Sequence, residues 1–291
     1  NLDALQAIAA ELNGRAQIRS LDIADAESHA ALRQFALEQF GRVDVVVNAT
    51  GADVRKPLAD HTPEEIQRLL DVNLRGAILL TQTFLPDMRE RNTGSIVHVG
   101  GFADGRLAFP FYSVDAATRA GLFTFIEAVN REQRLDQSQV QVGYFSPSPA
   151  ETEAERPFHP IWREMGVKIL PAEMIATDLL TMIAKRRRLS IMGGFSTRLF
   201  AGLNAVAPSL ADTLLLDSYA RTLKRHLVDG NPTPPPASLW LMRTGIALVV
   251  ISTILYGGLL ALPFLSISTA AKLTATPLLI LFGEVTFWVG G

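Results

Sequence analysis

The chain contains no cysteine, which excludes disulfides and thiolate metal sites. It also has almost no excess of either charge, because 27 Lys and Arg residues oppose 29 Asp and Glu residues. We therefore predict no general affinity for nucleic acid or for anionic surfaces. The histidines lack the spacing of metal ligands, and we predict no metal site; they are His29, His61, His98, His159 and His226.

Apolar sequence is abundant: 48% of the 291 residues are hydrophobic, enough for one large α/β domain or two modest ones. From Ala16 to about Gly194, short β-branched runs alternate with longer amphipathic segments, a pattern typical of parallel strands joined by helices. We predict a doubly wound parallel α/β sheet. Its strands are expected at Gln17–Asp22, Val43–Asn48, Ser95–Val99 and Val140–Phe145. Its helices are expected near Ala26–Phe40, Pro63–Arg91 and Ser113–Leu135.

The two ends of the chain look incomplete. Asn1 lies directly before a helical pattern, and Gly291 closes the apolar run FGEVTFWVGG, which has no polar flank. We therefore expect a domain that is truncated at its N-terminus and a final apolar segment that is cut short.

The last quarter of the chain has a different composition. Residues 229–238 hold four prolines and are expected to form a linker after an α/β domain of residues 1–228. The segment Thr244–Ala271 carries no charge, and Leu239–Leu265 is long enough for a transmembrane helix. A second run, Leu273–Gly291, would return as the other helix of a transmembrane hairpin, and it contains Glu284. Because Lys and Arg residues such as Lys185–Arg188 precede the first span, the positive-inside rule places the α/β domain on the cytoplasmic side of a membrane.

Four segments carry a recognisable pattern: LDIAD, VDVVVNATGADV, DVNLRGAILLTQTFLPDMRERNTGSIVHVGG and VQVGYFSPSPAET. Over roughly residues 1–194 they resemble the short-chain dehydrogenase/reductase family, which has a Rossmann-type fold. The resemblance implies NAD or NADP as cofactor. It assigns cofactor contacts to Asp22, Asn48, Ala49, Gly51, Pro147 and Thr152, and finds Ser148 where glycine is usual. The family's first strand and Gly-rich turn, which cradle the pyrophosphate, would lie before Asn1.

The family's catalytic positions are mostly substituted. Asn73 falls on the catalytic asparagine, whereas the serine, tyrosine and lysine positions hold Gly101, Asp115 and Arg119. In an alternative register Tyr112 is the proton donor, but the residue four positions later is then Ala116. An aspartate with an ordinary pKa is a poor acid at neutral pH, and a neighbouring arginine would lower that pKa further.

Asp115 and Arg119, four residues apart, are expected to form an ion pair on a helix surface. Otherwise they would bind a different polar ligand, or Asp115 would act as a general base. Together with the membrane segment, the substitutions indicate a membrane-anchored pseudoenzyme or scaffold of an oxidoreductase family. The alternative is an active NAD(P)-dependent oxidoreductase that acts on a lipid-like carbonyl or alcohol. The partners expected are the lipid bilayer, a membrane protein or a second copy of the chain.

Overall fold

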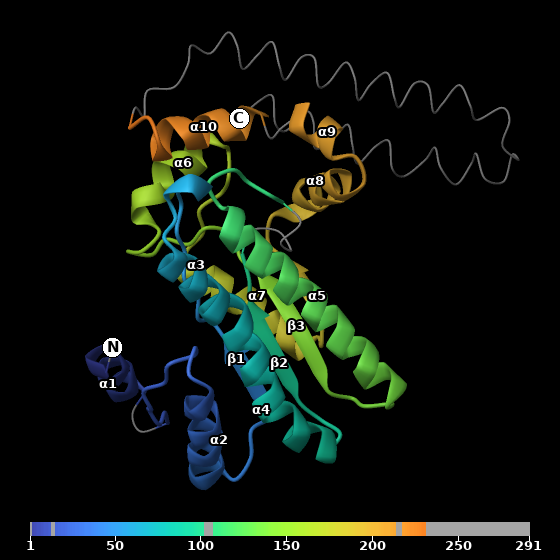
Figure 1. Cartoon of the computed structure of the whole chain (residues 1–291). Coiled ribbons are helices and arrows are strands. Elements are labelled where there is room, and N and C mark those ends of the chain that lie inside the picture. Colours follow the sequence, from blue (N-terminus) through green and yellow to red (C-terminus); the bar gives the residue numbers. More distant parts are fainter. Residues whose placement is uncertain (1, 13–14, 102–106, 214–216, 231–291) are drawn as a thin grey trace, which may run out of the picture. The chain divides into compact units, whose positions relative to one another are not determined.

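The structure, a computed structural model, describes residues 2–12, 15–101, 107–213 and 217–230 (Figure 1). The chain divides into two compact units, Asn1–Pro234 and Pro235–Gly291, and the description below concerns the first. Within the described residues no helix combines the length and the apolar character needed to cross a bilayer. The predicted spans Leu239–Leu265 and Leu273–Gly291, and all but the first two residues of the predicted linker, lie outside the described residues.

A parallel sheet of four strands forms the centre of the described unit, in the order β1-β2-β3-β4. Val45 lies opposite Ser95, Ser95 opposite Gln141, and Tyr144 opposite Leu189. The strands are β1 (Val45–Asn48), β2 (Ser95–Val99), β3 (Gln141–Ser146) and β4 (Leu189–Ile191). The sheet confirms the predicted parallel α/β class.

Helices connect the strands and continue beyond them (Figure 1). The helical elements before β2 are α1 (Leu2–Glu11), α2 (Ala26–Phe40), η1 (Leu58–Asp60), α3 (Pro63–Leu70), η2 (Asp71–Arg75) and α4 (Gly76–Glu90). Those after β2 are α5 (Ser113–Leu135), η3 (Arg156–Phe158), α6 (His159–Glu164), α7 (Ala172–Ala184), α8 (Gly194–Val206), α9 (Pro208–Ala211) and α10 (Asp217–Leu227).

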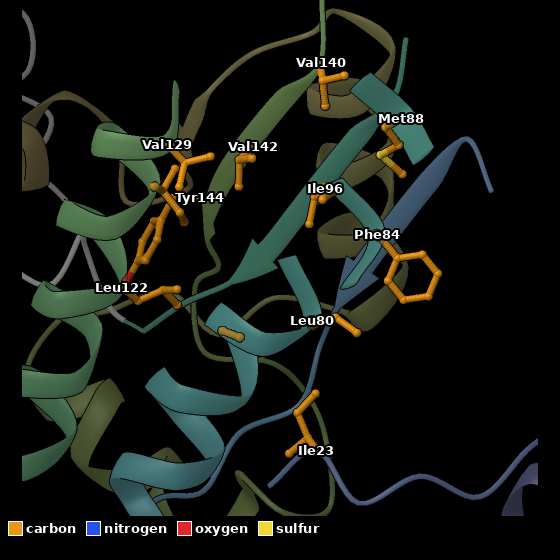
Figure 2. Close-up of a cluster of buried hydrophobic side chains, with 12 residues drawn as sticks. Ile23, Leu80, Phe84, Met88, Ile96, Leu122, Val129, Val140, Val142 and Tyr144 are labelled. Carbon is orange, nitrogen blue, oxygen red and sulfur yellow. The ribbon is translucent and has the colours of Figure 1, made fainter. Parts of the chain in front are cut away.

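The strand residues alternate between two cores, so helices cover both faces of the sheet. Ile96 of β2 packs with side chains of α4 and α5, among them Phe84 and Leu122 (Figure 2). The next residue, Val97, packs on the other face with Phe145 and with Met182 of α7. A third cluster joins α6 to α8, α9 and α10, through Trp162, Ala201, Ala211 and Leu223.

Local signals explain where several helices begin and end. Asp25 caps α2 by accepting a hydrogen bond from the Glu27 N–H at 3.1 Å, and Gly41, with a φ of 75°, ends that helix. Thr62 and Glu65 form a reciprocal capping box at the start of α3, with bonds of 3.2 and 2.8 Å.

Two predicted elements differ from the structure. Gln17–Asp22 is not a strand, because it forms no ladder with any strand in the part of the chain that the structure describes. The single helix predicted over Pro63–Arg91 is three consecutive elements, since the turn η2 has π-helical geometry and separates α3 from α4. The remaining predicted strands are correct to within two residues, and α2, β2 and α5 have the predicted limits.

Candidate functional site

The candidate site lies where the parallel strands end. Asn48 closes β1, Gly100 and Gly101 follow β2, and Pro147 follows β3. In a parallel sheet these carboxyl ends share one edge, where open α/β sheets bind their ligands. The loops of interest therefore meet at one edge although they are about fifty residues apart in sequence.

A buried network fixes the turn after β1. The Asn48 Nδ2 lies 3.1 Å from His98 Nδ1, and the Asn48 Oδ1 accepts hydrogen bonds from the Thr50 N–H and hydroxyl. On the other side of the imidazole, Thr81 Oγ1 lies 2.8 Å from Nε2 and donates its own proton to the Ala77 carbonyl. The His98 Nε2 must therefore carry the proton and Nδ1 must accept, which is the neutral ring. Burial lowers the pKa of His98 to about 4, in keeping with that form.

Part of the predicted cofactor set lines one open groove, with a volume of about 960 Å³. Asp22, Ala49 and Gly51 all border it, together with residues of α3. Asn48 lies beneath this groove in the network with His98 rather than in its lining. Pro147 and Thr152 lie after β3 and do not border it either. Asp22 is exposed, and one of its carboxylate oxygens accepts the Ala24 N–H at 2.9 Å.

Asn73 lies in the π-helical turn η2 and is buried. Its Oδ1 accepts the Ala52 N–H at 2.8 Å, and its Nδ2 donates to the Ala52 carbonyl at 2.8 Å and to Asp115 Oδ1 at 3.1 Å. Single π-turns within α-helices occur often at functional sites, because the extra residue re-aims a side chain. Here the turn directs Asn73 at both the loop after β1 and the start of α5.

Asp115 and Arg119 do not form the surface pair that their spacing predicts. Their side chains are only 15% and 12% exposed, with Arg119 Nε donating to Asp115 Oδ1 at 3.2 Å. Burial raises the pKa of Asp115, and the opposing effect of Arg119 is smaller. The expectation that Arg119 would set a lowered pKa is therefore wrong, because removal from water outweighs the ion pair.

Gly101, which follows β2, leaves room for the side chain of Arg119. A Cβ atom on Gly101 would lie 3.1 Å from the Arg119 Cγ, so any side chain there would crowd the arginine. A Cβ atom on Gly51 would lie 3.2 Å from Arg119 Nη2, which places this guanidinium between the groove and the catalytic positions. The structure therefore brings Asn73, Gly101, Asp115 and Arg119 together and joins them to the groove at Gly51.

Tyr112, the alternative proton donor, has different neighbours. Its hydroxyl is buried and has no hydrogen-bond partner among the described residues, and burial raises its pKa. Its ring centroid lies 5.4 Å from the Cζ of Arg55. A raised pKa keeps the phenol protonated, but no described cation contacts its oxygen to activate it.

Sequence reasoning missed a cluster built around Arg55. The Arg55 guanidinium makes two bonds to Glu155, of 3.1 and 3.0 Å, and a third to Asp53. Its Cζ lies 3.6 Å from the centroid of Phe158, and the Trp162 indole donates to Glu155. Arg55 and Glu155 are one hundred residues apart, so no local pattern could have paired them. This cluster ties the loop after β1 to the segment after β3.

The described part of the chain holds no group of three or more His, Asp or Glu residues that could bind a metal. What it offers is a groove lined by small residues, three acidic residues and one arginine, and beside it the guanidinium of Arg119, the amide of Asn73 and the buried carboxyl group of Asp115; the acidic residues of the groove are Asp22, Glu64 and Asp71, and its arginine is Arg68. That arrangement can bind a nucleotide and hold a proton. It does not contain the tyrosine and lysine pair expected for hydride-transfer chemistry in the family that the sequence resembles.

Comparisons with known proteins agree with this geometry. A family model described as short chain dehydrogenase matches residues 1–160. Dehydrogenase/reductase SDR family member 7B of Bos taurus is 25% identical over 198 residues, which are 66% of this chain and 60% of that protein. Estradiol 17-beta-dehydrogenase 1 of Rattus norvegicus is 37% identical over 116 residues, 40% of this chain and 33% of that protein. A solved short chain dehydrogenase/reductase family protein aligns with a TM-score of 0.52 and 27% identity, covering 59% of this chain and 71% of its own. The chain thus spans about three fifths of the bovine relative.

Proposed function

Because the chain belongs to the short-chain dehydrogenase family, we propose that it binds a nicotinamide nucleotide and serves as a membrane-tethered scaffold or regulatory subunit. The observation that carries this proposal is the buried Asp115–Arg119 pair at the proton-donor and lysine positions. The fold supports binding, whereas the substitutions remove the family's usual acid.

Nucleotide binding is supported by the groove that Asp22, Ala49 and Gly51 share. The small residues leave room for a ligand close to the backbone, and the Asp22 carboxylate can accept hydrogen bonds from an adenine or a sugar. Arg119 adds a fixed positive charge beside Gly51. NAD or NADP would supply hydride transfer when bound, and the chain's own residues would orient the nucleotide.

Loss of efficient reduction follows from the side chains that replace the family's acid. A positioned general acid typically contributes about 10²–10⁴-fold to a rate. The hydrogen bonds that Asp115 accepts from Asn73 and Arg119 oppose proton donation, although burial outweighs the effect of Arg119 and raises the pKa of Asp115. We therefore expect a protein that senses or retains nucleotide with little turnover.

The binding test is a titration of the full-length protein in detergent with NADH and NADPH, followed by nucleotide fluorescence. Asp22→Ala should weaken binding by about 10- to 150-fold, because it removes a hydrogen bond made by a charged acceptor, which is worth about 1.5–3 kcal/mol. Asp60→Ala is the matched control, since Asp60 is exposed and lies outside the groove. Equal affinities for both variants, or no binding by the wild-type protein, would overturn the proposal.

A second function, reduction of a lipid-like carbonyl with Asp115 as proton donor, is favoured by one observation. Burial raises the pKa of Asp115, which increases the protonated fraction above that of an exposed aspartate. Asp115→Asn should then lower turnover of a carbonyl substrate by about 10²-fold or more while nucleotide binding persists. Unchanged turnover would remove Asp115 from any mechanism.

A further inference from the structure

Helix α8 exposes apolar side chains on the face opposite its packed side. Ala201 is fully buried in a cluster with Ala211 of α9 and Leu223 of α10. Leu199 and Val206 are seven residues apart, about two helical turns, so they share a face that points away from Ala201. Their exposed fractions are 56% and 86%. Leu210 of α9 adds a third exposed apolar side chain.

Basic residues lie on helix α10, whose Leu223 packs in the same buried cluster as Ala201 and Ala211. Arg221 and Lys224 are exposed, whereas Thr222 and Leu223 between them are buried. The helices of one buried cluster thus expose leucine and valine on α8 and arginine and lysine on α10, and apolar and basic side chains together favour binding at a membrane interface. The balanced net charge of the chain gives no general attraction to anionic surfaces, but two adjacent bases act locally, within about one Debye length.

These helices lie shortly before the predicted transmembrane run in the sequence. Helix α10 ends at Leu227, and the predicted transmembrane run begins at Leu239, twelve residues later. Twelve extended residues reach at most about 40 Å. A span beginning at Leu239 would therefore keep the end of α10 within that distance of a bilayer surface.

We propose that Leu199, Val206 and Leu210, named here the α8–α9 face, rest on the headgroup region of an anionic phospholipid bilayer, with Arg221 and Lys224 contacting lipid phosphates. This inference rests on the membrane tether of the proposed function. It adds a second contact, which orients the α/β unit on the membrane instead of leaving it free at the end of a linker.

The absence of cysteine makes the proposal directly testable, because a single introduced cysteine is the only thiol in the protein. Val206→Cys is labelled with an environment-sensitive fluorophore in the full-length protein. The protein is then reconstituted into vesicles of phosphatidylcholine and phosphatidylglycerol, with or without nitroxide-labelled lipid. Leu135→Cys is the matched control: it is 83% exposed, close to the 86% of Val206, and it ends α5 at the opposite end of the unit (Figure 1). Leu199→Cys reports independently on the same face.

The expected result is that the labels at positions 206 and 199 shift to shorter wavelength and lose most of their emission to nitroxide lipid, while the label at 135 changes little. Replacing phosphatidylglycerol by phosphatidylcholine should weaken the quenching; unchanged quenching would overturn the role of the two bases. Protein that floats with vesicles but is quenched equally at 206 and 135, or at neither, contradicts the α8–α9 face and leaves the tether intact. A blue shift without quenching indicates a protein partner or a second copy and also overturns the proposal. Failure to float with vesicles contradicts both the face and the tether.

Discussion

His98 shows how one buried side chain can hold the turn after β1 in place. It lies on β2 under the Asn48–Gly51 turn and bonds to Asn48 on one side and Thr81 on the other. In the sequence it is one of five scattered histidines, because neither partner is close to it along the chain. Its effect depends on remaining neutral, since the Nδ1 atom must accept the Asn48 amide proton.

The depressed pKa of His98 predicts a pH dependence of stability. The pKa falls from its ordinary value of 6.5 to about 4, so between these values the unfolded chain binds a proton more readily than the folded one. Stability is therefore fully present above pH 6.5 and is lost as pH falls toward 4, with a loss of about 3 kcal/mol. Urea unfolding from pH 7 to 4 should show a shallower loss for His98→Gln than for the wild-type protein. His159→Gln, whose ring contacts a backbone carbonyl, is the control and should keep the wild-type slope; equal slopes for all three would contradict the assignment.

Asp115 and Arg119 illustrate what residue spacing does and does not determine. Four-residue spacing predicts correctly that the two side chains pair. It says nothing of their surroundings, which come from Asn73 in η2 and from Gly101 after β2. A pair expected at the surface is therefore buried at the site, and the direction of the aspartate pKa shift is opposite to the expected one.

At the scale of elements, the sequence predicts the helices and strands that have a regular apolar pattern. Periodicity and caps locate α2, α5 and three of the four described strands, β1, β2 and β3, because these signals are local. The failures are the features that depend on distant partners. Gln17–Asp22 has strand composition but no neighbouring strand in the described sheet, and Arg55 meets Glu155 across one hundred residues. Four of the predicted catalytic positions do meet, because the ends of parallel strands share one edge.

The Arg55 cluster joins two loops of that edge, and its loss should be costly. Arg55→Ala would leave the partly buried Glu155 without its ion-pair partner, with only the Trp162 indole still bonded to it, and would remove the contact with Phe158, so we expect about 2–4 kcal/mol of destabilisation. Arg42→Ala is a close match, since Arg42 also bonds an aspartate two residues away but is 67% exposed. That variant should change stability by less than about 0.5 kcal/mol. Chemical unfolding measures both, and proteolysis should cut near Thr152 faster only in the Arg55 variant. Equal stabilities would contradict a structural role for the cluster.

At the scale of the whole molecule, the proposed tether predicts how the protein behaves in cells. The full-length chain should stay in the membrane fraction after alkaline carbonate extraction, because a span of about 20 apolar residues is retained by the bilayer. A chain that ends at Asp229 should lose this resistance to extraction. Retention of the shortened chain in the carbonate pellet, or extraction of the full-length chain, would contradict the tether.

The parallel sheet also has a kinetic consequence during synthesis. β1 pairs only with β2 among the described strands, and Ser95 emerges from the ribosome fifty residues after its partner Val45. At about 5–20 residues per second, β1 waits roughly 3–10 s for that partner. Until β2 arrives, the backbone groups of the apolar run Val45–Val47 that will pair with β2 have no partner strand, and unpaired strand backbone is a site of association with other chains. Slower translation lengthens this interval, and the yield of folded protein should therefore depend on chaperones that shield β1 until β2 arrives.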